Sequence, residues 1–276
     1  MGSDNTALGD RMKWYESRYT DQTFMPLVPV LARLDGKAFH TFTQGLQRPY
    51  DERLSRLMTE TTKYLVHETN ARCGYTQSDE ISLVWLAEDW ESEIFFAAKL
   101  QKMNSVLASM TTAFFNRALD KYLPEKADRV ALFDCRVFQV PSNSEASNCF
   151  LWREQDATRN SVQMAARAHY SHNECENKNT SDLHEMLFQK SINWNNYPGF
   201  FKRGTYVRRR TIDRAFTKAE LEELPLKHAA RSNPNLTFKR GTVMEENFPP
   251  MRSVINRDEV LLFGAEPVTL IEEEEE

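Results

Sequence analysis

VLARLDGKAFHTF (residues 30–42) and CGYTQSDEISLVW (residues 73–85) are the two stretches that decide the fold. The first begins with a short apolar run that ends at Gly36, which predicts a buried strand. The second holds two strand-like runs, joined by a turn at residues 78–80. Between the stretches, residues 51–70 carry apolar side chains at helical spacing. The predicted order is therefore strand, helix, strand, strand.

Two further segments complete this unit. Residues 94–119 have a helical apolar pattern, and residues 130–140 form another strand-like run. The order strand-helix-strand-strand-helix-strand is that of ferredoxin-like and polymerase-palm sheets, so we expect an α+β fold with helices packed on an antiparallel sheet. The third strand of such a unit lies between the first two. Asp35, at the end of the first strand, and Asp79, in the turn between the second and third, should therefore lie at one sheet edge.

The C-terminal half has a more helical pattern, followed by a basic strand-like stretch around Gly204. Residues 144–171 are expected to form one long helix or a broken pair, and residues 181–189 another helix. Residues 241–262 give no clear pattern, because Pro249 and Pro250 interrupt any regular element. We divide the chain into a palm-like catalytic domain (1–141), a mostly helical region with a basic strand (142–270) and an acidic disordered tail (271–276).

The net charge of −5 comes from the C-terminus. Glu272 to Glu276 are five consecutive carboxylates, and without them the 40 acidic residues fall to the number of basic residues, 35. The body of the protein is therefore nearly neutral, so a nucleic-acid surface requires local clustering of cations.

No apolar run reaches the length of a membrane span, and the four cysteines form no CxxC pair, as expected of reduced thiols. We expect a cytoplasmic protein that does not bind membranes.

The pair Asp35 and Asp79 suggests a metal site. Two facing carboxylates repel unless a cation lies between them, and magnesium suits an oxygen-only site completed by water and phosphates. Two magnesium ions can activate an attacking hydroxyl and stabilise a leaving pyrophosphate. The carbonyl of Gly36 is a possible further ligand, and Glu80 either binds metal or orients water and Lys37. The alternative is structural, because Asp-Gly turns and Ser-Asp-Glu hairpin loops are common.

Two groups of cations suit phosphate binding. Lys99 and Lys102 are three residues apart on one predicted helix face, where they bind a triphosphate or are merely solvated. Downstream, basic residues alternate with aromatic ones, as in surfaces that hold RNA phosphates and stack bases; a solvated strand face is the alternative. This second group comprises Lys202, Arg203, Arg208, Arg209, Arg210 and Arg214, with Phe200, Phe201 and Tyr206 among them.

Several motifs, in this order, resemble the tRNA-His guanylyltransferase family. They are RLDGKAFHTF (33–42), GYTQSDE (74–80), the Lys99/Lys102 pair, FDCRV (133–137) before Pro-Ser-Asn, the Trp152-Arg153, Asp156 and Asn160 motif, and KRGT (202–205). The resemblance covers about residues 10–210. It is closest to the guanylyltransferase-like branch found in bacteria, archaea and phages.

The resemblance implies an enzyme that extends tRNA at its 5′ end, in the 3′-to-5′ direction, on a palm fold. The family activates a 5′-monophosphate with ATP, the 3′-hydroxyl of GTP then attacks, and pyrophosphate is released. By resemblance, Asp35, the Gly36 carbonyl and Asp79 bind two magnesium ions, Glu80 is a further essential acid, and the protein is a homotetramer. Contacts to nucleotide are implied for Asp35, Gly36, Lys37, Ala38, Phe39, His40, Ser78, Asp79, Lys99 and Lys102. Contacts to tRNA are implied for Trp152, Arg153, Asp156, Asn160, Lys202, Arg203, Arg208, Arg209 and Arg210.

One segment departs from the family pattern. Eukaryotic members carry His-Ile-Asn-Asn after the Trp-Arg motif, whereas this chain has Thr158-Arg159-Asn160-Ser161. We therefore expect templated addition or repair at tRNA 5′ ends rather than strict recognition of tRNA-His. The main alternative is a palm-fold nucleotide cyclase or dinucleotide synthase, which shares the metal pair but needs no RNA surface. A non-catalytic RNA-binding protein and a metal-dependent nuclease are further alternatives.

Overall fold

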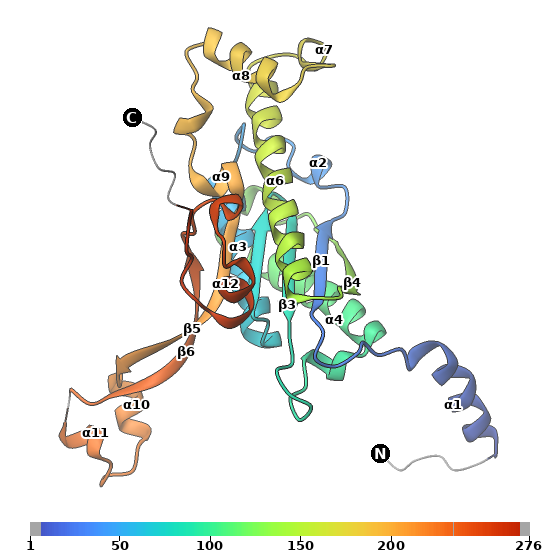
Figure 1. Cartoon of the computed structure of the whole chain (residues 1–276), viewed down its shortest axis with the longest axis vertical. Coiled ribbons are helices and arrows are strands. Elements are labelled where there is room, and N and C mark those ends of the chain that lie inside the picture. The colour runs from blue at the N-terminus through green and yellow to red at the C-terminus, as the bar shows by residue number, and fades with distance from the viewer. Residues whose placement is uncertain (1–6, 234, 271–276) are drawn as a thin grey trace.

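The computed structural model describes residues 7–233 and 235–270, so the predicted acidic tail lies outside the described residues. A six-stranded sheet in the order β4-β1-β3-β2-β5-β6 forms its centre (Figure 1). Every neighbouring pair of strands is antiparallel. The strands are β1 (Val30–Gly36), β2 (Cys73–Gln77), β3 (Glu80–Trp85), β4 (Phe133–Gln139), β5 (Thr205–Ala215) and β6 (Thr237–Glu246).

The first four strands confirm the predicted α+β arrangement. β3 lies between β1 and β2 and is antiparallel to both. Helix α3 (Glu52–Thr69) joins β1 to β2; the side chain of Asp51 caps its start, and Asn70 ends it in the left-handed conformation. Helix α4 (Leu100–Arg117) leads from β3 to β4 and begins later than predicted. The turn Phe95–Ala98 precedes it, with left-handed backbone that cannot continue an α-helix.

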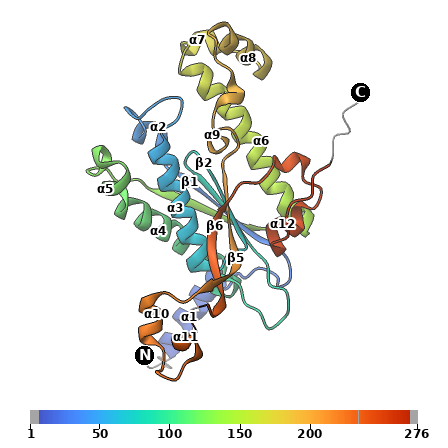
Figure 2. The same cartoon turned by 90° about the vertical axis from the view of Figure 1, so that its left-hand side faces the viewer.

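The two faces of the sheet carry different layers (Figure 2). Strand side chains alternate between faces, so Val30, Ala32 and Leu34 pack in the core that contains α3 and α4. Leu31 belongs to the other core, which includes Phe150 of helix α6 (Asn143–Arg167). By the same alternation, Asp35 faces the α6 side of the sheet. The predicted helix over residues 144–171 is thus a single helix that covers the functional face.

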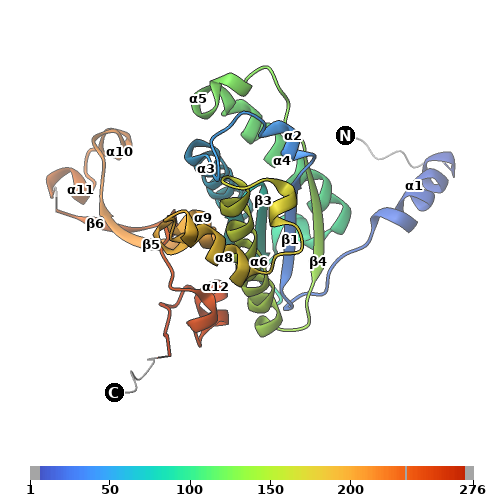
Figure 3. The same cartoon turned by 90° about the horizontal axis from the view of Figure 1, so that it is seen from above.

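The sheet continues into the C-terminal half. The predicted basic strand is β5, which pairs with β2, and β6 then pairs with β5. β6 was not predicted, because its charged and polar residues and Gly241 give no apolar alternation. Beyond the sheet, the β5–β6 hairpin projects as an arm that carries α10 (Lys218–Glu223) and α11 (Ala229–Ser232) at its tip (Figure 3).

The remaining helices surround this framework. Helix α1 extends away from the body on the side opposite the hairpin arm (Figure 3). In the described part of the chain, no helix is long and apolar enough to span a bilayer. The helices are α1 (Ala7–Thr20), α2 (Phe39–Phe42), α5 (Leu119–Tyr122), α7 (His172–Cys175), α8 (Thr180–Gln189), α9 (Gly199–Arg203) and α12 (Arg257–Phe263).

Candidate functional site

The fold brings Asp35 and Asp79 to one sheet edge, as predicted. Asp35 is the register partner of Glu80 across the β1–β3 ladder. The N–H of Gly36 donates to the carbonyl oxygen of Asp79 at 3.2 Å, which holds the end of β1 against the β2–β3 turn. A cavity of about 340 Å³ opens there, between the sheet edge and α6. It is lined by Asp35, Gln77, Ser78, Asp79, Glu80, Arg153, Asn160, Gln163, Met164 and Arg167.

The electrostatics of this cavity favour a cation. Burial raises the pKa of Asp79 above its ordinary value, and the nearby negative charge of Asp35 raises it further. The hydroxyl of Ser78, which donates to Asp79 Oδ1 at 3.0 Å, lowers the pKa but does not cancel these two effects. A cation between the two carboxylates would stabilise both ionised forms.

The donor set fits magnesium. The carboxylates of Asp35 and Asp79 offer oxygen ligands only, and magnesium commonly completes its octahedron with water and substrate phosphates. Among the described residues, no group of three His, Cys, Asp or Glu side chains converges to hold a metal ion.

Gly36 is needed at the turn that follows β1. A Cβ at this position would overlap the ring of Phe39. That ring is buried in the core against Phe42, Phe115 and Phe133 and is only 4% exposed. Because the ring packs under the turn, the contact with nucleotide that the resemblance implies for Phe39 would have to come from its backbone, and it stays a prediction.

Glu80 and Arg153 form a buried ion pair at the base of the cavity. Arg153 Nε and Nη2 donate to the two oxygens of Glu80 at 2.6 and 2.8 Å, and Nη2 also donates to Asp156 at 3.0 Å. Burial raises the pKa of Glu80, whereas Arg153 lowers it. The Arg153 side chain is 10% exposed and paired with Glu80, so this structure gives it a structural role, and its implied contact with tRNA stays a prediction. Trp152 remains half-exposed, beside Arg33 and Arg153.

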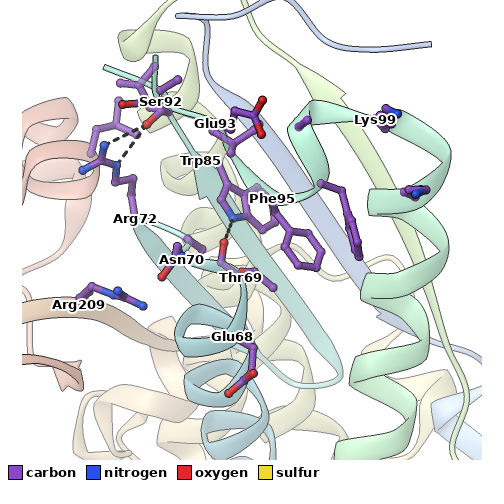
Figure 4. A pocket seen from close by; sticks show the side chains of 18 of the residues that line it. Glu68, Thr69, Asn70, Arg72, Trp85, Ser92, Glu93, Phe95, Lys99 and Arg209 are labelled. Carbon is purple, nitrogen blue, oxygen red and sulfur yellow. Dashed lines mark hydrogen bonds between the residues drawn. The ribbon is translucent and has the colours of Figure 1, made fainter. Parts of the chain in front are cut away.

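Lys99 and Lys102 lie elsewhere. Val30 pairs with Trp85 at the end of the β1–β3 ladder opposite Asp35. Trp85, Lys99 and Lys102 line a separate pocket of about 790 Å³ at that end (Figure 4). Within one chain, the two lysines therefore lie in a different pocket from Asp35 and Asp79, and their contact with a triphosphate stays a prediction. Sequence spacing placed them on one helix face but carried no information on which end of the sheet that face meets.

The arginines of β5 point in different directions. Arg208 is 1% exposed; its Nε donates to Glu246 at 3.0 Å and its Nη1 to the carbonyl of Ala265 at 2.7 Å. Arg210 pairs with Glu246 as well, whereas Arg209 points to the opposite face of the sheet. The expected tRNA contact of Arg208 is therefore wrong, because strand alternation turns it into the protein.

Sequence reasoning did not name as site residues four of the residues that line the cavity, Gln77, Gln163, Met164 and Arg167. Gln163 and Arg167 of α6 line it opposite the carboxylates. Arg167 is exposed and has no acidic partner in the described part of the chain, so it is free to meet a phosphate. The sequence does contain a pattern that predicts Gln163 and Arg167. Polar residues follow helical spacing and form one face of α6: Arg153, Asp156, Asn160, Gln163 and Arg167.

Comparisons with known proteins agree with this geometry. Residues 9–141 match the family model described as tRNAHis guanylyltransferase. A bacterial tRNA-His guanylyltransferase-like protein in complex with ATP is 39% identical, with a TM-score of 0.69, over 74% of this chain and 87% of that one. A second such structure, in complex with GTP, is 32% identical, with a TM-score of 0.67, over 90% and 94% of the two chains.

A curated relative extends the similarity to eukaryotes. The tRNA(His) guanylyltransferase of Eremothecium gossypii is 26% identical over 72% of this chain and 90% of its own length. The matched segments include both carboxylate-bearing stretches, and the matched folds share the palm-like sheet. The chain belongs to the tRNA-His guanylyltransferase family.

Proposed function

We propose that this protein is a magnesium-dependent nucleotidyltransferase that adds guanosine, or another nucleotide selected by a template, to the 5′ end of tRNA. The observation that carries the proposal is the convergence of Asp35 and Asp79 in one cavity that also presents Arg167, an exposed arginine with no acidic partner among residues 7–233 and 235–270. Acidic oxygens for a metal and a cation for phosphate are what transfer of a nucleotidyl group requires.

Each part of the cavity has a role in this reaction. Asp35, the Gly36 carbonyl and Asp79 would hold magnesium, which when bound activates the attacking 3′-hydroxyl and offsets charge on the leaving group. Arg167 faces the same space and would orient a phosphate of the incoming nucleotide. Arg153 fixes Glu80 and thereby the turn that presents Asp79.

Nucleotide binding is proposed at the turn after β1 and at the β2–β3 turn. Backbone groups of residues 36–39, with the exposed side chains of Lys37 and His40, border the carboxylates, and Ser78 lies on the facing turn. ATP and GTP are the proposed substrates, because the two bacterial relatives were solved in complex with these nucleotides. We also propose that the enzyme acts in the cytoplasm as a homotetramer.

Templated addition is favoured by the segment 158–161. Asn160 remains at the catalytic cavity and donates to Asp156, whereas Thr158, at the position of the family histidine, lies on another side of α6. The chain thus lacks the imidazole of the eukaryotic pattern. We propose that base pairing, rather than a protein side chain, selects the added nucleotide.

The deciding experiment uses magnesium, ATP, labelled GTP and two tRNAs that lack their first nucleotide, with C or A opposite the gap. Extension on the C template alone is the expected result. Equal extension of both tRNAs would overturn the templated reaction in favour of untemplated guanylylation. Label in a small nucleotide product, without extended tRNA, would overturn the proposal in favour of a nucleotide cyclase.

A further inference from the structure

A second cavity, of about 440 Å³, lies on another face of α6. Leu151, Gln155 and Thr158 of α6 line it, whereas Arg153, Asn160, Gln163 and Arg167 of the same helix line the catalytic cavity. Segments 194–195 and 202–203 and residues 250 and 252 form the remaining walls. The helix therefore separates two cavities, and the reaction described above uses only one of them.

The second cavity is rich in positive charge. It is lined by Arg159, Lys202, Arg203 and Arg252, and by a single acid, Glu154. Arg159 is paired with Asp156, and Lys202 Nζ donates to the carbonyl of Asn195 at 2.6 Å. Arg203 and Arg252 have no acidic partner within 4 Å among residues 7–233 and 235–270, so two cations remain available to a ligand.

Glu154 does not neutralise these arginines by direct contact. Its carboxylate, 5% exposed, accepts hydrogen bonds from the hydroxyl of Tyr206 at 3.0 Å and from the N–H of Met251 at 2.9 Å. Arg203 and Arg252 act on it only through their charge, which lowers its pKa against the stronger effect of burial. The side chain thus serves to fix the floor of the cavity, and the arginines stay free.

The wall beside the cations is partly apolar, and Lys202 Nζ lies 5.3 Å from the centroid of the Trp194 ring. Trp194, Leu151 and Pro250 contribute to it. The indole N–H of Trp194 donates to the hydroxyl of Ser161 at 3.1 Å, which holds the ring in place. Cations next to a fixed aromatic ring suit a phosphate that carries a flat base, because the phosphate pairs with arginine and the base stacks. The volume is within the range of small-molecule sites.

We infer that this cavity binds one nucleotide unit, with its phosphate on Arg203 and Arg252 and its base against the apolar wall. We assign the nucleotide to the tRNA, at a point away from the 5′ end that is extended; this assignment rests on the proposed function. Arg252 is exposed and Lys202 and Arg203 are half-buried, so a continuous strand can reach the cations without entering a closed site. A free nucleotide has the same chemistry and is the competing source.

The test compares Arg252→Gln with Arg117→Gln, an equal loss of charge at the end of α4 on the opposite side of the sheet. For Arg252→Gln we expect the KM for truncated tRNA to rise about fivefold or more, with the effect on KM rather than kcat. The slope of log K against log salt for tRNA binding should fall by about one, as expected for one lost phosphate contact. Arg117→Gln should match the wild type in both measurements, and both variants should melt within about 2 °C of it.

Titration with GMP distinguishes a nucleotide of the tRNA from a free nucleotide as the ligand of this cavity. If Arg252→Gln loses one bound GMP per chain while the KM for tRNA is unchanged, the cavity binds free nucleotide and the assignment to tRNA is overturned. If neither tRNA nor GMP binding changes in Arg252→Gln and in Arg203→Gln, the cavity is no nucleotide site and the whole inference fails. Turnover by the wild type reports on the proposed function separately, because tRNA binding and its salt slope are measured without turnover.

Discussion

Arg153 on α6 binds both carboxylate oxygens of Glu80, at the start of β3, and both side chains are about 10% exposed. Glu80 follows Asp79 directly and pairs with Asp35 across the ladder. The guanidinium therefore connects the helix that forms one wall of the cavity to the turn that presents the Asp79 carboxylate. Arg153 is a positioning residue for the site.

Removing this guanidinium should affect stability and catalysis differently. Arg153→Gln leaves a buried, unpaired carboxylate, so we expect about 3–5 kcal/mol of destabilisation. The double variant Arg153→Gln/Glu80→Gln should recover much of that loss in urea unfolding, but it should not recover transfer activity. Equal stability of the single and double variants would contradict the pairing.

The same change should move the pH dependence of transfer. Glu80 is needed in its ionised form to pair with Arg153, so activity is present above its pKa and lost as the pH falls through it. Arg153 lowers this pKa against burial, and removing the arginine raises it. In Arg153→Lys, which keeps the charge but loses the planar fork, the acid limb of the rate profile should shift to higher pH by less than in Arg153→Gln. If the acid side of the rate profile stays at the same pH in both variants, ionisation of Glu80 does not control the fall in activity at low pH.

Asp79→Asn should abolish transfer and yet stabilise the protein in the absence of magnesium. The pKa of Asp79 is raised in the folded state, so the ionised carboxylate lowers stability, and this cost appears as the pH rises through the folded pKa. The amide removes that cost at pH 7. Melting curves should show a Tm at least equal to that of the wild type, and added magnesium should raise only the wild-type Tm.

A matched control for the carboxylates lies on the neighbouring strand. Asp134 of β4 is the register partner of Asp35, but it is exposed and lies outside the catalytic cavity. Asp35→Asn should therefore reduce transfer by at least about 10²-fold, the scale of a lost transition-state contact, whereas Asp134→Asn should keep most of the activity. Similar losses in both variants would argue against a specific role of Asp35.

Gly36→Ala should disturb the site through packing. The added methyl group overlaps the buried ring of Phe39, and overpacking of this kind costs about 1–3 kcal/mol. Because the displaced segment follows Asp35, transfer activity should fall as well. The control is Gly241→Ala on β6, where the nearest atom is 3.9 Å from the new Cβ; urea unfolding should show little change there.

Substitutions of Arg208 and Arg209 should distinguish an arginine that stabilises the fold from an arginine on the surface. Arg208→Gln breaks a buried ion pair and should destabilise the protein by about 3–5 kcal/mol. Arg209→Gln removes an exposed side chain that donates to the carbonyl of His67, so its effect on the free energy of unfolding should be below about 1 kcal/mol. Comparable losses of unfolding free energy in both variants would contradict the assignment of Arg208 and Arg209 to opposite faces of β5.

The sequence contained enough to predict the sheet of the first 140 residues. The apolar runs around Asp35 and Asp79 and the helical patterns between them determine the strand order, because an antiparallel strand between two parallel ones has one natural placement. The order in turn predicts that the two aspartates meet. These predictions depend on local periodicity and topology alone.

Other features depended on long-range packing. Nothing local shows that Arg208 turns inward to Glu246, or that Arg153 binds Glu80 rather than RNA, because each pairing joins segments far apart in the chain. The place of Lys99 and Lys102 depends on which end of the sheet α4 begins at. β6 lacks apolar alternation, so only its pairing with β5 identifies it.

The β5–β6 hairpin arm joins the sheet close to the turn that holds Ser78 and Asp79. Thr205, where β5 begins, pairs with Thr76 of β2, two residues before the turn that holds Ser78 and Asp79. At Gly204 a Cβ would lie 2.6 Å from the carbonyl oxygen of Thr76, so the backbone at the base of the arm packs closely against β2. The base of the arm is therefore hydrogen-bonded to the strand that leads into the turn at Ser78 and Asp79, so any displacement of β5 at this point would be passed to that turn through the β2–β5 pairing.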